Sequence, residues 1–127
     1  MSAHALMQNA YGDATRATGT PRSVEYQVFG RITGALNRAS RGDRPFRELV
    51  AALHDNLELW TVIAADVANP GNALPQELRA GLAGLAKFVH AHTRKVLREE
   101  AGAEILIEIN TAVMRGLRGQ LPPRREG

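Results

Sequence analysis

The sequence predicts an all-α fold, a small bundle of about four helices with a Pro/Gly helix-hairpin elbow near residues 68–75. Apolar residues recur every three or four positions in four separate segments, which is the period of a helix. Short stretches rich in glycine, proline, serine and asparagine separate these segments. We expect the bundle to occupy residues 20–118, between a mobile N-terminal segment (1–19) and a flexible basic tail (119–127).

The composition is that of a soluble protein without a disulfide framework. With 44% hydrophobic and 23% charged residues, the chain of 127 residues is ordinary for one globular domain. It has no cysteine, which excludes disulfides and thiolate metal sites. No apolar run reaches the roughly 18 residues of a membrane helix, and the N-terminus lacks the basic and apolar regions of a signal peptide. We therefore expect a cytoplasmic protein with no membrane segment.

The net charge of +3 and the pI of about 9.9 raise the question of nucleic-acid binding. The excess lies at the end of the chain, where four arginines against one glutamate in residues 115–127 account for all of it. The remainder is neutral overall, so we interpret the tail as a solubilising segment that touches polyanions weakly.

A first helix is predicted to start at Pro21, with Thr20 as its N-cap. Its apolar stripe consists of Val24, Val28, Ile32, Ala35, Leu36 and Ala39. Gly30 and Gly34 are four apart and share a face, and each costs about 1 kcal/mol relative to alanine inside a helix. Either this weakness is tolerated, or the glycines allow another helix, from this chain or a partner, to approach closely.

A second helix is predicted from near Asp43 or Pro45 to about Val67. Its expected core stripe is Phe46, Leu49, Val50, Leu53, Leu57, Trp60, Ala64 and Val67. Asn56 falls on the same stripe, so it needs a hydrogen-bond partner or a place at the edge. Leu59 and Val62 point away from the stripe, which suggests a second contact surface.

The elbow follows at Asn69-Pro70-Gly71-Asn72, a sequence that suits a type II turn. Pro70 sets φ at the first central position, and Gly71 accepts the positive φ that the second requires. Pro75 is expected as the first helical residue, because that position needs no N–H donor. We predict a fixed elbow between two antiparallel helices.

The third helix is predicted from about Pro75 to Glu100 and the fourth from about Ala103 to Leu117. The third carries the stripe Leu78, Leu82, Leu85, Val89, Thr93 and Val96. The fourth carries Leu106, Ile109, Val113 and Leu117. Ile105 and Ile107 flank this last stripe on opposite sides, so its apolar face is wider than one neighbour covers. Either this helix is central in the bundle, or part of its face awaits a partner.

Few residues suggest catalysis. His90 and His92 are two positions apart on a helix and cannot hold one metal ion together. His54 and Glu58 are four apart, which is typical of a surface pair. The sequence has no glycine-rich phosphate loop and no HExxH or GxSxG motif. We expect no enzyme activity, no metal and no cofactor.

A series of motifs resembles the FlaF family of flagellar biosynthesis regulators over residues 8–118. The matching segments are Arg22-Ser23-Val24-Glu25-Tyr26, Asn56-Leu57-Glu58-Leu59-Trp60, Asp66, Asn69-Pro70-Gly71-Asn72-Ala73-Leu74-Pro75, Leu78-Arg79, His92-Thr93, Leu106-Ile107-Glu108-Ile109-Asn110 and Met114-Arg115-Gly116-Leu117. The most specific part is the stretch from Trp60 to Arg79.

The resemblance implies a cytoplasmic helical protein that binds flagellin, with FlbT as a counterpart, as export chaperone and regulator of flagellin production. It carries no catalytic residues. Within its most specific stretch we assign a structural role to Trp60, Pro70, Gly71, Asn72, Leu74, Pro75, Leu78 and Arg79.

Our leading hypothesis is a flagellin-binding protein that shields an amphipathic helix of its client. The candidate contact residues are Leu59, Val62, Ile105, Ile107, Gly30 and Gly34. One alternative is an RNA-binding regulator of flagellin messenger. The arginine-rich tail favours it, whereas the neutral remainder and the few aromatic residues, most at expected core positions, speak against it. Another alternative is a scaffold that associates with itself.

Overall fold

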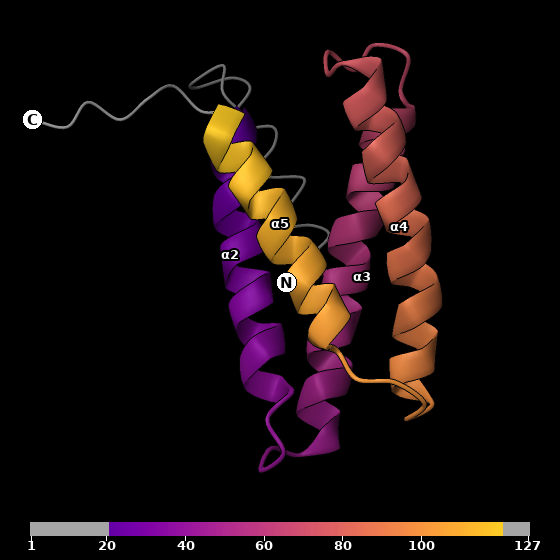
Figure 1. The fold of residues 1–127 in the computed structure, drawn as a ribbon. Helices are drawn as coiled ribbons and strands as arrows, with labels where there is room; N and C mark the ends of the chain where they lie inside the picture. The colour runs from indigo at the N-terminus through magenta and orange to yellow at the C-terminus, as the bar shows by residue number, and fades with distance from the viewer. Residues whose placement is uncertain (1–20, 121–127) are drawn as a thin grey trace, which may run out of the picture.

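Four helices make up the described part of the chain. The computed structural model describes the backbone of residues 21–120 and the side chains of residues 26–116. The helices are α2 (Pro21–Ala39), α3 (Phe46–Ala68), α4 (Gln76–Leu97) and α5 (Glu104–Gln120), and these residues form no strand (Figure 1). The all-α bundle is thus confirmed. The predicted mobile segment 1–19 and residues 121–127 of the predicted tail lie outside the described residues.

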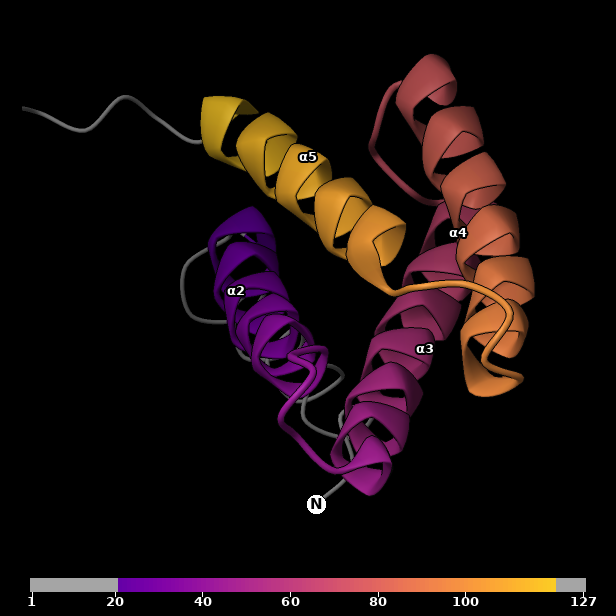
Figure 2. The same ribbon diagram turned by 60° about the horizontal axis from the view of Figure 1, so that its bottom comes forward.

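The helices run in alternating directions but do not pack equally. α2 packs on α3 and on α5, α3 packs on α4, and the backbones of α2 and α4 do not approach each other within residues 21–120. α4 and α5 make few contacts, and Figure 2 shows α5 turning away from α4 beyond the loop that joins them. α4 is therefore held mainly by α3, while α2, α3 and α5 meet around the centre of the core.

The core is built around the tryptophan of α3. Trp60 is completely buried, and the ring of Phe29 meets it edge-on, with ring centroids 5.8 Å apart and planes at 79°. Such a pair contributes about 0.5–1.5 kcal/mol beyond its buried area. Every helix adds further fully buried side chains, namely Leu36 of α2, Leu53 and Leu59 of α3, Val89 of α4 and Leu106 of α5.

α3 is rotated about its axis relative to the orientation that its apolar stripe predicts. Phe46 and Val50, which we expected in the core, are 44% and 37% exposed, and Leu59, which we expected to point away, is completely buried. The reason is that α2 and α4 cover α3 from two sides, so its buried face is wide and has Asn56 near its centre. Asn56 is tolerated there because its side-chain oxygen accepts a buried hydrogen bond.

The elbow between α3 and α4 is a hydrogen-bonded turn, but it is not the predicted type II turn. The backbone N–H of Asn72 donates to the carbonyl of Asn69 at 2.9 Å. However, the φ of Gly71 lies outside the left-handed region that a type II turn requires. Instead, the N–H of Gly71 donates to Oδ1 of Asn69 at 2.9 Å, which is the local side-chain turn that asparagine favours. The asparagine side chain, rather than the freedom of glycine, therefore sets the turn.

Two side chains fasten the elbow to the C-terminal end of α3. Asn72 donates through Nδ2 to the carbonyl and to Oδ2 of Asp66, at 3.1 and 3.0 Å. Arg79 of α4 donates through Nε to the carbonyl of Val67 at 3.0 Å and through Nη2 to that of Asn69 at 3.1 Å. The last carbonyls of a helix have no partner within it, and they also form the negative end of its dipole. The positively charged guanidinium group of Arg79, which can donate to two oxygens at once, therefore suits this position.

The remaining elbow residues lead the chain back into the core. Pro75 is the N-cap of α4 and not its first helical residue, so the helix begins one residue later than predicted, at Gln76. Leu74 packs against the core, and Leu78 is half-buried in the first turn of α4. The elbow thus turns the chain and also covers the end of the core.

Candidate functional site

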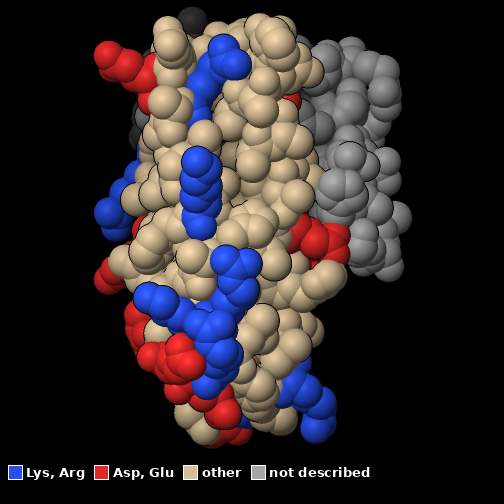
Figure 3. Space-filling view, turned by 90° about the vertical axis from the view of Figure 1, so that its right-hand side faces the viewer, with Lys and Arg blue, Asp and Glu red and all other residues tan. Residues whose placement is uncertain are grey.

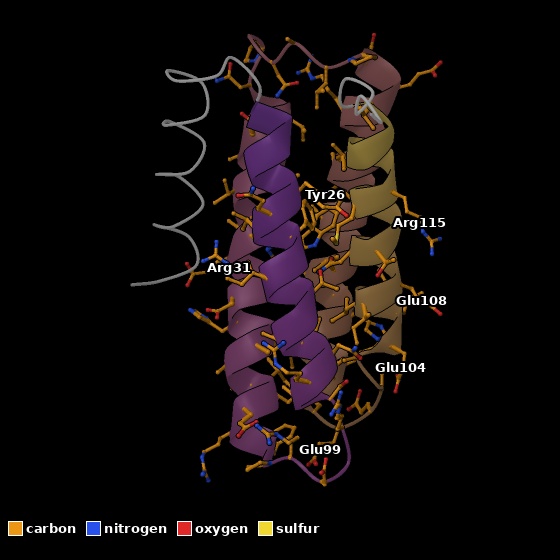
Figure 4. The ribbon with its side chains drawn as sticks, turned by 90° about the vertical axis from the view of Figure 1, so that its left-hand side faces the viewer. Tyr26, Arg31, Glu99, Glu104, Glu108 and Arg115 are labelled. Carbon is orange, nitrogen blue, oxygen red and sulfur yellow. The ribbon has the colours of Figure 1, made fainter. Side chains whose placement is uncertain are left out.

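A groove runs between α2 and α5. Its volume is about 350 Å³, and it is open to solvent. The α2 residues that line it span about three helical turns, or roughly 16 Å. Figure 4 looks onto this pair of helices and shows Tyr26 between them, with Arg115 extending from the outer side of α5. The lining residues are Tyr26, Gly30, Thr33, Gly34 and Asn37 of α2 and Ile107, Thr111, Met114 and Arg115 of α5.

The two glycines of α2 lower the floor of the groove. A Cβ at Gly30 would lie 3.5 Å from Cε of Met114, and a Cβ at Gly34 would lie 3.3 Å from Nη1 of Arg38. The glycines are thus covered by the ends of two flexible side chains and not by the backbone of another helix. Methionine adapts its shape easily, so Met114 can move aside or repack when another group enters.

A buried polar network lies beneath this floor. Nδ2 of Asn110 donates to Oγ1 of Thr33 at 3.1 Å and to Oδ1 of Asn56 at 2.7 Å, while its Oδ1 accepts from Nε1 of Trp60 at 2.9 Å. Asn110 uses both of its donor hydrogens and its acceptor, so α2, α3 and α5 are joined through one side chain. Thr33 belongs to both the network and the groove lining.

The six predicted contact residues do not form one surface. Gly30, Gly34 and Ile107 come together in the groove. Leu59 is in the core, and its assignment as a contact residue is wrong because of the rotation of α3. Val62 is half-buried and packs against the core, away from the groove lining. Ile105 is 36% exposed on α5 but does not line the groove.

The sequence interpretation missed most of the polar lining. Tyr26, Thr33 and Asn37 stand at helical spacing with the two glycines, and Thr111 and Met114 stand at helical spacing with Ile107. The signal that could have revealed them is this second period of three and four, which runs beside the core stripe on each helix.

The groove is mainly apolar and weakly cationic. Arg115 is the one charged residue of its lining, and no carboxylate lines it. Glu104 and Glu108 extend from the outer side of α5, next to Arg115 in Figure 4. A partner with an apolar ridge fits this lining better than a small charged molecule does.

The three histidines within the described residues, His54, His90 and His92, have structural partners. Nε2 of His54 contacts Oε1 of Glu58 at 2.5 Å, which is the predicted surface pair. Nδ1 of His90 lies 2.8 Å from the carbonyl of Ala86. Among residues 21–120, no three His, Cys, Asp or Glu side chains lie close enough together to hold a metal ion. None of the described helices is long and apolar enough to span a bilayer.

Comparison with known proteins places the chain in a family. Searches of curated proteins and of solved structures gave no match. A protein-family model described as flagellar protein FlaF matches residues 7–117, which is most of the chain and nearly the range of the resemblance found in the sequence. The chain belongs to the FlaF family of flagellar proteins.

Proposed function

We propose that this protein binds flagellin in the cytoplasm and acts as an export chaperone or as a regulator of flagellin production. We assign the contact to the groove between α2 and α5. Membership of a flagellar family supports the biological setting. The observation that carries the binding mode is the convergence of Gly30, Gly34 and Ile107 in one apolar groove.

The groove suits one helix of a client. An amphipathic helix inserts an apolar ridge of side chains into such a groove and leaves its polar face in water. The low floor over Gly34 and the adaptable Met114 accommodate side chains of different size. A client segment that becomes ordered on binding loses about 2–5 kcal/mol of the interaction energy to that ordering. We therefore expect a moderate, reversible complex, as release for export requires.

Binding, not catalysis, is the activity that we propose. A client helix held in the groove does not associate with other client molecules, which is the protective step of a chaperone. The fraction of this protein in the complex depends on the concentration of flagellin that has not been exported. This concentration is what a regulator of production must sense. FlbT is a candidate partner in that response.

The test is a titration of flagellin with a variant that fills the groove. Gly34→Leu places a side chain over the floor, where its Cβ would meet only the flexible end of Arg38. The matched control is Gly84→Leu, because Gly84 is an exposed glycine inside α4 and a Cβ at this position would meet nothing within 4 Å. Both variants replace a helical glycine, so both should fold at least as well as the parent.

We expect isothermal titration to give a negative heat-capacity change for the parent and for Gly84→Leu. Gly34→Leu should bind at least tenfold more weakly while its helical circular dichroism is unchanged. Unaltered flagellin binding by Gly34→Leu would exclude the groove as the contact. Absence of binding by the parent at high micromolar concentration would exclude the function itself.

A further inference from the structure

The outer face of α4 carries an exposed row of cations. Lys87, Arg94, Lys95 and Arg98 are all exposed and lie within one side of the helix, over about 16 Å of its length. Figure 3 shows Lys and Arg side chains following one another down this face of the molecule. We call Lys87, Arg94 and Lys95, together with Phe88, the α4 strip.

The cations of the α4 strip form no direct ion pair within the described part of the chain. Arg98 forms an ion pair with Glu100 at 3.1 Å, whereas Lys87, Arg94 and Lys95 form no ion pair with the described side chains. The helix Gln76–Leu97 contains four basic residues and one acidic residue, while α3 contains one basic and four acidic residues. The neutral total over most of the chain thus conceals two helices of opposite charge.

An aromatic ring stands beside these cations. Phe88 is 44% exposed, and its ring stacks on the imidazole of His92, with centroids 5.4 Å apart and planes at 17°. Nε2 of His92 is in turn 2.9 Å from the carbonyl of Gly102, in the loop that leads to α5. The phenyl ring is therefore held in place from one side while much of it faces water.

We propose that the α4 strip binds a single-stranded nucleic acid, with the three cations on its phosphates and a base stacked on Phe88. An exposed aromatic ring among unpaired cations is the combination that such ligands require, since every base has a face that stacks. A duplex keeps its bases inside and offers no such face. An acidic helix would need apolar side chains to dock on, but those beside the cations and Phe88 are small, namely Ala80, Gly81, Gly84 and Ala91. The other large exposed apolar side chain of α4, Leu97, is nine residues from Phe88 and therefore on the opposite side of the helix. The proposal is independent of the flagellin groove, which lies between α2 and α5.

The test is a fluorescence-anisotropy titration of the full-length protein with labelled oligo(U) and oligo(dT) of equal length, between 20 and 200 mM salt. Three phosphate contacts predict a log–log salt slope of about −2, because each contributes roughly 0.7 on a single strand. The double variant Arg94→Gln/Lys95→Gln should flatten the slope by about 1.4. Phe88→Ala should weaken binding about tenfold and leave the slope unchanged. Comparison of the two oligonucleotides shows whether the 2′-hydroxyl adds to the contact.

Two controls separate the α4 strip from general basic charge. Arg31→Gln/Arg41→Gln removes two exposed arginines elsewhere, and Arg31 points away from α5 in Figure 4. Arg124→Gln/Arg125→Gln removes two charges from the end of the chain. Both should leave affinity and slope nearly unchanged. The proposal is overturned if neither oligonucleotide binds at 20 mM salt or if only the Arg124/Arg125 variant reduces the slope. It is equally overturned if Phe88→Ala has no effect while polyglutamate competes as well as the oligonucleotides.

Discussion

Nε1 of Trp60 donates a hydrogen bond of 2.9 Å to Oδ1 of Asn110, fifty residues further along the chain, and both side chains are completely buried. The bond fixes α5 against α3, although the backbones of these two helices are not in direct contact. The same asparagine binds Thr33 of α2 and Asn56 of α3. One amide therefore sets the relative position of three helices and, through Thr33, the floor of the groove.

Asn110→Ala should lower the free energy of unfolding by about 2–4 kcal/mol, because it leaves the indole N–H of Trp60 and the oxygen of Asn56 buried without partners. Urea denaturation monitored by tryptophan fluorescence measures the loss. Asn37→Ala is the control, since Asn37 is exposed and should change the value by less than about 0.5 kcal/mol. Equal stability of the two variants would contradict the role given to the network.

Leu59→Asp and Ile105→Asp should behave in opposite ways. Leu59 is fully buried, so a carboxylate there should cost more than about 3 kcal/mol or prevent folding. Ile105 is 36% exposed, and its replacement should cost about 1 kcal/mol or less. Thermal unfolding followed by circular dichroism distinguishes them. A stable Leu59→Asp protein would mean that α3 has the orientation its apolar stripe predicts, and not the one observed.

Gly71→Ala tests the conformation of the elbow. Because the φ of Gly71 is not left-handed, alanine should be tolerated and should raise stability by up to about 1 kcal/mol by restricting the unfolded chain. A Cβ at this position would lie 3.4 Å from Oδ1 of Asn69, which is an ordinary contact. A type II turn would instead make alanine destabilising. A fall in the melting temperature of Gly71→Ala would therefore restore the type II assignment.

Arg79→Ala should destabilise the protein by about 1–2 kcal/mol, because two carbonyls at the end of α3 lose a charged donor. Arg79→Lys should recover only part of this, since an ammonium group lacks the planar fork that reaches both oxygens. Chemical denaturation of the two variants, with exposed Arg47→Ala as control, gives the comparison. Full recovery by lysine would show that charge alone, and not the fork, holds the elbow.

The helices could be predicted from the sequence because each one repeats its apolar residues at the helical period over several turns. The rotation of α3 could not be predicted, because an apolar stripe is drawn from the side chains of one helix, each taken by itself. It does not account for a polar residue that can be buried because a partner far away in sequence binds it. Asn56 is such a residue, and its partner is Asn110. The need for a partner was predictable, but the identity of that partner was not.

The groove was predictable only in part, because some of its lining residues stand out in the sequence and others do not. Gly30 and Gly34 could be predicted as contact residues because glycine is costly inside a helix, and Ile107 because it widens the apolar face of its helix. The polar residues beside them have ordinary helical propensities and gave no such signal. The α4 strip was missed because opposite charges on α3 and α4 cancel in the total, and because the sequence interpretation gave Phe88 no role of its own.

The uneven packing of α4 has a consequence for local opening of the native state. The hydrogen bonds of Asn110 join α2, α3 and α5, while α4 is attached to the rest almost entirely through its neighbour α3. A helix with one main contact detaches more readily than helices that share a network, and it does so as a separate cooperative unit. Amide protons of α4 should therefore exchange with deuterium sooner than those of α3, and the basic face could swing outward while the remaining three helices stay together.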